Sequence, residues 1–152
     1  MALKTEWTLA ELRDVFPSMP RTPPSVFQCL VPASGHGRYL KESGGKRHFA
    51  DVRVQATPAK TFLVRLLHEW PSSVPAFAIA ALDEALLRGI VQGSFTAFPE
   101  PIWGCVVACT AVTHADGETT PQAISIAASL AVQNLLVDGR WVVDGPPAKE
   151  PA

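Results

Sequence analysis

The sequence contains little cysteine and almost no surplus of charge. Three cysteines among 152 residues are an odd number, which argues against a disulfide framework and fits a reducing compartment. The 13 Lys and Arg residues nearly balance the 14 Asp and Glu residues, leaving a formal net charge of −1. This balance excludes a long-range field that draws in nucleic acid, so any contact with RNA must be local.

Long apolar runs and nucleotide-binding loops are also missing. No stretch reaches the length that spans a membrane, and residues 1–9 contain neither an apolar run nor a basic cluster. These features predict a soluble, cytoplasmic protein that does not bind membranes. The sequence has no G-x-x-x-x-G-K-[ST] loop, so we expect neither nucleotide binding nor nucleotide hydrolysis.

Patterns of catalytic and metal-binding residues are absent from the sequence as well. The four histidines stand at no metal-ligand spacing and are interpreted as scattered surface imidazoles. They are His36, His48, His68 and His114. Ser125 and Ser129 are predicted packing contacts rather than nucleophiles, because no histidine accompanies them in a recognisable arrangement. We therefore expect no metal, no cofactor and no enzymatic activity.

The N-terminal segment predicts a short helix followed by a connector. Thr8 and Glu11 form a capping box, which predicts a helix running to about Phe16. A proline cluster at residues 17–24 predicts an extended connector. We expect residues 1–23 to be an appendage that stands apart from the sheet of the main domain, residues 24–146.

Strands are predicted at residues 25–31, 49–56 and 61–67, and Pro32 to Gly37 is expected to end or bulge the first of them. In the second strand, three small or β-branched residues alternate with three polar ones, as a half-buried strand requires. The apolar set is Ala50, Val52 and Val54, and the polar set is Asp51, Arg53 and Gln55.

Two helices, 75–93 and 120–136, flank a long apolar strand at 102–113. Cys105 and Cys109 share one face of that strand, about 13 Å apart at the usual rise, too far to bridge, and are expected core residues. Small residues are expected to join the helices side by side: Ala78, Ala81, Ala85, Ala127, Ala128 and Ala131.

A closing strand at 140–143 and a disordered tail at 147–152 complete the pattern. The expected fold class is therefore α+β, with two helices on one face of a mostly antiparallel sheet in two layers.

The most specific segment is Lys41-Glu42-Ser43-Gly44-Gly45-Lys46-Arg47-His48-Phe49-Ala50-Asp51-Val52, a glycine turn with a basic tip that opens into an alternating strand. It resembles the tip loop of the fourth domain of elongation factor G and of its eukaryotic counterpart, elongation factor 2. The order of the following helix, apolar strand, polar loop and second helix is similar as well. The resemblance covers residues 24–146 and implies that domain's unusual left-handed β-α-β crossover.

The resemblance also implies a site. In the family, two loops at one end of the fold contact transfer RNA and messenger RNA in the decoding region of the small ribosomal subunit. By position, these loops are residues 43–49 and 113–118 of this sequence. The expected RNA-binding residues are Arg38, Lys41, Ser43, Gly44, Gly45, Lys46, Arg47, His48, His114 and Asp116.

The loops also depart from the family pattern. Arg47 and Ala50 stand where the family has glycines, and Asp51 stands where it has a histidine. In the second loop, Ala115 separates His114 from Asp116. Asp116 and Glu118 place negative charge beside the basic loop, which weakens attraction to phosphate.

Two functions remain open at this point. The first is a non-catalytic module in translation that binds the ribosome or structured RNA through the two loops. The second is a protein-protein interaction or homodimerisation module that has lost RNA binding. Enzymes of this fold family, small-molecule kinases and a dehydratase among them, have glycine-rich helix starts and paired histidines that this sequence lacks.

Overall fold

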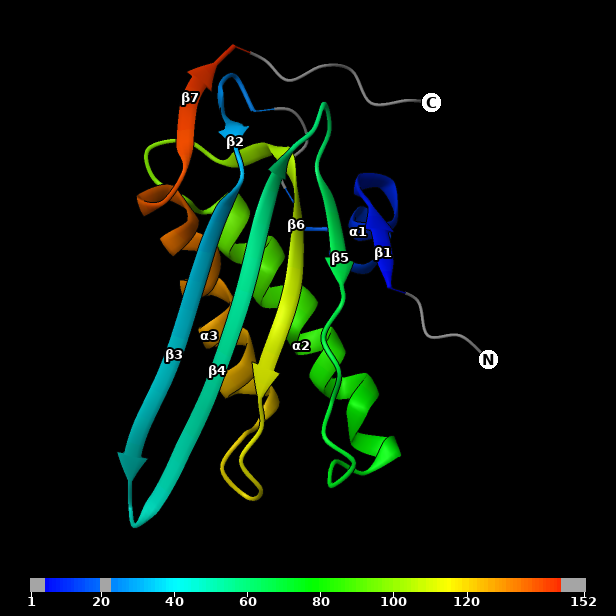
Figure 1. Cartoon of the computed structure of the whole chain (residues 1–152). Coiled ribbons are helices and arrows are strands. Elements are labelled where there is room, and N and C mark those ends of the chain that lie inside the picture. Colours follow the sequence, from blue (N-terminus) through cyan, green and yellow to red (C-terminus); the bar gives the residue numbers. More distant parts are fainter. Residues whose placement is uncertain (1–4, 20–22, 146–152) are drawn as a thin grey trace.

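A mixed sheet of seven strands forms one layer of the described part of the chain, and helices cover one of its faces (Figure 1). The structure is a computed structural model that describes residues 5–19 and 23–145. Its strands are β1 (Glu6–Thr8), β2 (Val26–Val31), β3 (Ala33–Ser43), β4 (Lys46–Pro58), β5 (Leu63–Leu66), β6 (Ile102–Thr113) and β7 (Arg140–Asp144). Its helices are α1 (Leu9–Val15), α2 (Ala76–Phe95), α3 (Pro121–Asn134) and the 3₁₀ turn η1 (Leu135–Val137). No described helix is long and apolar enough to cross a membrane.

Most strand pairs are antiparallel, as the sequence predicts. The path β1-β5-β6-β2-β7 runs through the sheet, and β4 lies between β6 and β3. The pairs β5–β6 and β2–β6 are parallel, whereas β1–β5, β2–β7, β3–β4 and β4–β6 are antiparallel. Where β4 ends, with Pro58 opposite Cys105, β2 takes its place beside the start of β6. The α+β class is thus confirmed.

The connection between β5 and β6 has the uncommon hand. These neighbouring parallel strands are joined through α2, so they form a β-α-β unit. Figure 1 shows both strands running downward, with β6 to the left of β5 and α2 behind the sheet, which makes the crossover left-handed. The general preference is strongly right-handed, so strand patterns alone point the other way.

The core lies on the helix-covered face of the sheet, as the side chains of β4 show. Ala50, Val52, Val54 and Ala56 are all buried, which confirms the predicted alternation. Pro32 ends β2, as expected, whereas residues 33–37, which were expected to be part of that break, begin the long strand β3. A Cβ at Gly35 would lie 2.0 Å from the carbonyl oxygen of Ala131, and one at Gly37 would lie 2.0 Å from that of Ala127. These glycines therefore let the backbone of α3 lie directly against β3.

Helices α2 and α3 pack together through small residues, with one correction to the expected set. Ala85 and all three predicted alanines of α3 are buried, and Ala78 is half-buried. Ala81 is exposed, because the closest approach of the helices lies further along α2. There, a Cβ on Gly89 would lie 2.3 Å from the carbonyl oxygen of Ser125.

The N-terminal segment joins the sheet and the core, contrary to the expected appendage. The capping box is confirmed, because the Glu11 amide donates to Thr8 Oγ1 at 3.3 Å and the Thr8 amide donates to Glu11 Oε1 at 3.2 Å. However, β1 pairs with β5, and Leu9 and Leu12 are buried. Three residues of strand are too few to show a pattern in the sequence. Residues 20–22 of the connector and the tail at 147–152 lie outside the described residues.

The cysteines are core residues, as expected. Cys29, Cys105 and Cys109 are free and buried. Burial raises the pKa of all three thiols and takes that of Cys109 to about 12, because a thiolate loses hydration in the core. Their role is therefore packing rather than thiol chemistry.

Candidate nucleic-acid interface

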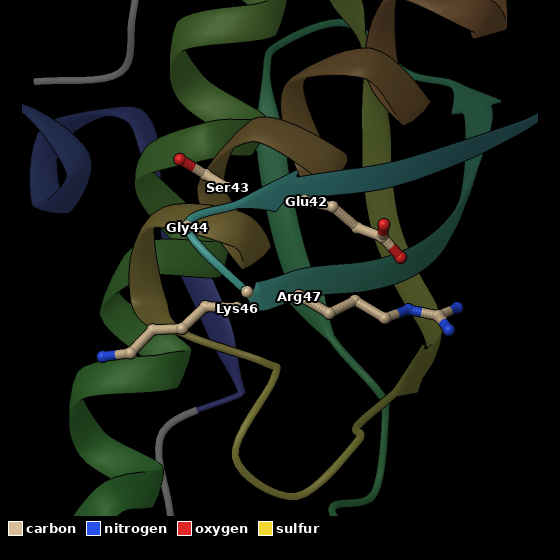
Figure 2. A pocket seen from close by; sticks show the side chains of 6 residues that line it. Glu42, Ser43, Gly44, Lys46 and Arg47 are labelled. Atoms are coloured by element: carbon tan, nitrogen blue, oxygen red, sulfur yellow. The ribbon is translucent and has the colours of Figure 1, made fainter.

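A hairpin formed by β3 and β4 protrudes beyond the helices at one end of the molecule (Figure 1). We call the segment Lys41–His48 the tip hairpin. Its turn has Gly44 at φ 58° and Gly45 at φ 79°, the left-handed conformations that a two-residue hairpin turn requires. A Cβ at either glycine would meet nothing within 4 Å, so the turn stands in open space. Residues 42–47 line a hollow of about 290 Å³ beside it (Figure 2).

The tip hairpin has two faces with different charge. Side chains alternate along each strand, and the register sets Lys41 opposite His48 and Ser43 opposite Lys46 on the side that continues the helix-covered face. The outer side has Glu42 opposite Arg47. Figure 2 shows the side chains of Lys46 and Arg47 extending in different directions from the turn.

Basic residues on the outer side are already engaged. Arg47 Nε lies 3.3 Å from Glu118 Oε1 in the second loop. Further from the turn, His36 Nε2 lies 2.8 Å from Asp51 Oδ2, and the Arg38 guanidinium stacks 5.4 Å from the centre of the Phe49 ring. Arg47, one of the expected RNA-binding residues, is therefore already paired with a carboxylate.

Lysines on the helix side are not engaged in this way. Lys41 and Lys46 are exposed, and within residues 5–19 and 23–145 neither has a carboxylate partner. His48, opposite Lys41, is half-buried. The tip hairpin thus presents two unneutralised ammonium groups on one side, a local positive charge on a chain of almost no net charge.

The second loop, residues 113–118, is fastened to the base of the tip hairpin. The Phe49 amide donates to the carbonyl oxygen of Glu118 at 3.0 Å. The Thr119 hydroxyl donates to the Phe49 carbonyl at 2.8 Å and accepts from the Ala115 amide at 2.9 Å. The structure therefore brings the two predicted loops together at one end of the fold, as the resemblance implies.

The side chain of His114 is largely buried and does not face solvent, where it could bind RNA. Its side chain is 9% exposed, and Nδ1 lies 3.4 Å from Asp116 Oδ1 without the alignment of a hydrogen bond. The imidazole packs edge-on to Trp70, with ring centres 6.2 Å apart. Asp116 is 75% exposed, so the loop presents a carboxylate to solvent and keeps its histidine inside.

A half-buried cluster of side chains beneath the second loop was not indicated by any pattern in the sequence. His68 is 3% exposed, and its Nε2 lies 2.9 Å from Asp83 Oδ1. Trp70 Nε1 donates to the same oxygen at 2.8 Å. The interpretation of the histidines as surface imidazoles is therefore wrong for His68 and His114. Together these contacts tie the segment after β5 to α2 and support the second loop from below.

Metal-binding geometry does not occur in the part of the chain that the structure describes, where no group of three or more His, Cys, Asp or Glu side chains could hold an ion. The site consists of cations, a glycine turn and hydrogen-bonded loops. Exposed cations of this kind attract negatively charged groups.

Comparison with known proteins identifies the fold but no family. No protein-family model matches the chain, and no curated protein matches it. A solved structure of a protein from Thermus thermophilus is similar, with a TM-score of 0.66 at 23% identity. The match covers 83% of this chain and 18% of that chain, so this chain spans less than a fifth of the other's length. The similarity shows a shared two-layer α+β fold.

Proposed function

We propose that this chain is a relative of the fourth domain of elongation factor G, a non-catalytic module in translation. In this role it binds the ribosome or structured RNA through the tip hairpin. The resemblance of residues 41–52, the order of the elements and the left-handed crossover support the relationship. The Thermus thermophilus structure is consistent with it, because there the matching fold is 18% of a longer chain.

The observation that carries this function is a pair of lysines on one side of a protruding hairpin, Lys41 and Lys46, which have no carboxylate partner among the described residues. An ammonium group without a carboxylate neighbour is free to replace a counterion at a phosphate. Gly44 and Gly45 have no side chains, and the open space around them lets a nucleic-acid backbone approach the turn closely. A narrow hairpin of this kind fits a groove or cleft in folded RNA better than a flat surface.

Other residues of the site hold the two loops in position rather than bind RNA. Arg47 and Glu118 join the two loops, and the Thr119 hydroxyl joins the second loop to β4. The contacts of Trp70 with Asp83 and with His114 hold the second loop from below. We therefore assign phosphate contact to Lys41 and Lys46. His48 and Arg38 contribute secondarily, because the Arg38 guanidinium stacks on Phe49 but has no carboxylate partner among the described residues. His114 is left out because it is buried.

The experiment measures binding of the purified chain to ribosomal subunits by co-sedimentation. In parallel, it measures binding to a fluorescent RNA hairpin and to an unstructured RNA of equal length. Three or four phosphate contacts predict a slope of log affinity against log salt of about −2 to −3, using the counterion-release coefficient. We expect binding at about 50 mM salt that is largely lost at about 200 mM. Absence of binding to all three at the lower salt concentration, or binding that salt does not change, would contradict the function.

A further inference from the structure

The sheet has open edges, and the unpaired backbone groups on these edges are protected to different degrees. In the described part of the chain, β1, β3 and β7 each pair with only one neighbouring strand. Unpaired backbone groups on an edge strand are a template for another strand, so proteins usually block them. β1 is only three residues long, which leaves β3 and β7 as the edges that matter.

The edge of β3 is blocked near its start. Asp138 Oδ2 accepts from the Ser34 amide at 2.7 Å, and Asn134 Nδ2 donates to the carbonyl oxygen of His36 at 2.7 Å. These side chains, from the end of α3 and the turn after η1, occupy the backbone groups that an added strand would need. Toward the tip hairpin, charged residues such as Lys41 and Glu42 deter pairing further.

The edge of β7 has no such protection among the described residues. No described side chain caps its backbone from outside, and Val142 and Val143 are 43% and 55% exposed. Arg140 and Asp144, at its two ends, are exposed, and neither has an ion-pair partner within residues 5–19 and 23–145. An apolar strand with opposite charges at its ends is therefore presented to solvent.

We propose that β7 pairs with β7 of a second copy of this chain, forming an antiparallel dimer about a two-fold axis at Val142. In this register all five residues of the strand pair. Arg140 of each copy lies opposite Asp144 of its partner, and Val142 lies opposite itself. Opposite charges directly across an antiparallel pair stabilise it, as do paired β-branched residues. Such a contact is isologous and closes at two copies.

The dimer joins two sheets into one and leaves the tip hairpins free. Figure 1 shows β7 at the end of the sheet opposite the turn between β3 and β4. The two tip hairpins of a dimer therefore lie far from the shared edge. This interface goes beyond the proposed RNA binding and does not depend on it, because no residue of β7 belongs to the tip hairpin.

The test uses two charge reversals and sedimentation velocity across a concentration series. Asp144→Arg places Arg opposite Arg at both ends of the homodimer, and Arg140→Asp places Asp opposite Asp. Each variant alone should need at least about a tenfold higher concentration to dimerise than the native chain. An equimolar mixture of the two variants restores opposite charges at both ends and should dimerise again. Lys60→Glu, a charge reversal at an exposed residue outside both β7 and the tip hairpin, is the matched control and should dimerise like the native chain.

Restoration in the mixture would establish the β7 contact, because a merely misfolded variant cannot be rescued by another. A native chain that stays monomeric at all concentrations would overturn the inference. So would native-strength dimers in both single variants, since the interface would then lie elsewhere. If β7 instead pairs with a strand of a different protein, the purified native chain would sediment as a monomer, and this result would also overturn the inference.

Discussion

Arg47 Nε lies 3.3 Å from Glu118 Oε1, and this ion pair joins the turn of the tip hairpin to the second loop. It also divides the basic residues of the tip hairpin into two groups. Arg47 is already paired with a carboxylate, whereas Lys41 and Lys46 have no carboxylate partner among the described residues. The geometry therefore distinguishes residues that hold the two loops together from residues that are free to bind an anion.

The strength of this ion pair is open to a double-mutant cycle. Arg47 and Glu118 are 47% and 35% exposed, so solvent screens them, and we expect a coupling free energy of about 0.2–1 kcal/mol. The cycle compares Arg47→Gln, Glu118→Gln and the double variant by urea denaturation. The exposed helical pair Glu84 and Arg88 provides a reference of the same kind. A coupling energy of zero would show that the contact does not hold the loops.

Replacing Gly37 with Ala tests the close approach of α3 to β3. The added methyl group would lie 2.0 Å from the carbonyl oxygen of Ala127, so the helix has to shift. We expect a loss of about 1–3 kcal/mol in the free energy of unfolding, measured with urea. Gly145→Ala is the matched control, because the methyl group there meets nothing within 4 Å. Equal stability of the two variants would mean that α3 does not pack as described.

The seam between α2 and α3 allows a second matched comparison. Ala128 is fully buried and Ala81 is exposed. Ala128→Leu should overpack the seam and cost about 1–3 kcal/mol, whereas Ala81→Leu should change stability little. Thermal midpoints of both variants provide the measurement. A larger loss for Ala81→Leu than for Ala128→Leu would reverse the assignment of the two faces.

The buried thiols should resist alkylation in the native state. Because burial raises the pKa of Cys109 to about 12, very little of this thiol is ionised at pH 8. Iodoacetamide should therefore label Cys29, Cys105 and Cys109 slowly, and the rate should rise with pH. Mass spectrometry of native and urea-unfolded samples follows the reaction. Labelling that is equally fast in both samples would contradict the burial of these residues.

Regular patterns in the sequence predict much of the fold. They do not predict features that depend on single contacts between distant segments. Alternation in β4 is visible because Ala50, Val52 and Val54 stand at period two, and the capping box is a local pattern. The glycines of β3 look like a break in the sequence, since only the position of α3 shows that they serve close packing. β1 is too short to carry any period.

The sequence predicts where the candidate site lies, but not which contacts its residues make. The glycine turn and the basic residues locate the tip hairpin from sequence. Partners such as Arg47 with Glu118, or His68 with Asp83, come from distant parts of the chain, and no spacing rule links them. For the same reason, the burial of His114 against Trp70 could not be read from the sequence.

The most direct measurement compares the salt dependence of RNA binding among lysine variants. Lys41→Gln and Lys46→Gln each remove one unpartnered charge from the tip hairpin. Lys60→Gln is the matched control, because Lys60 is exposed just beyond the far end of β4 and has no carboxylate partner among the described residues. Anisotropy of a labelled structured RNA across a salt series gives the slope for each protein.

For each tip lysine removed, the slope should become shallower by about 0.7, the value for one phosphate contact on single-stranded or irregular RNA. The double variant should lose about twice that, and Lys60→Gln should match the native chain. Equal slopes for the native chain and all the lysine variants would contradict the assignment of the tip hairpin as the RNA-binding end.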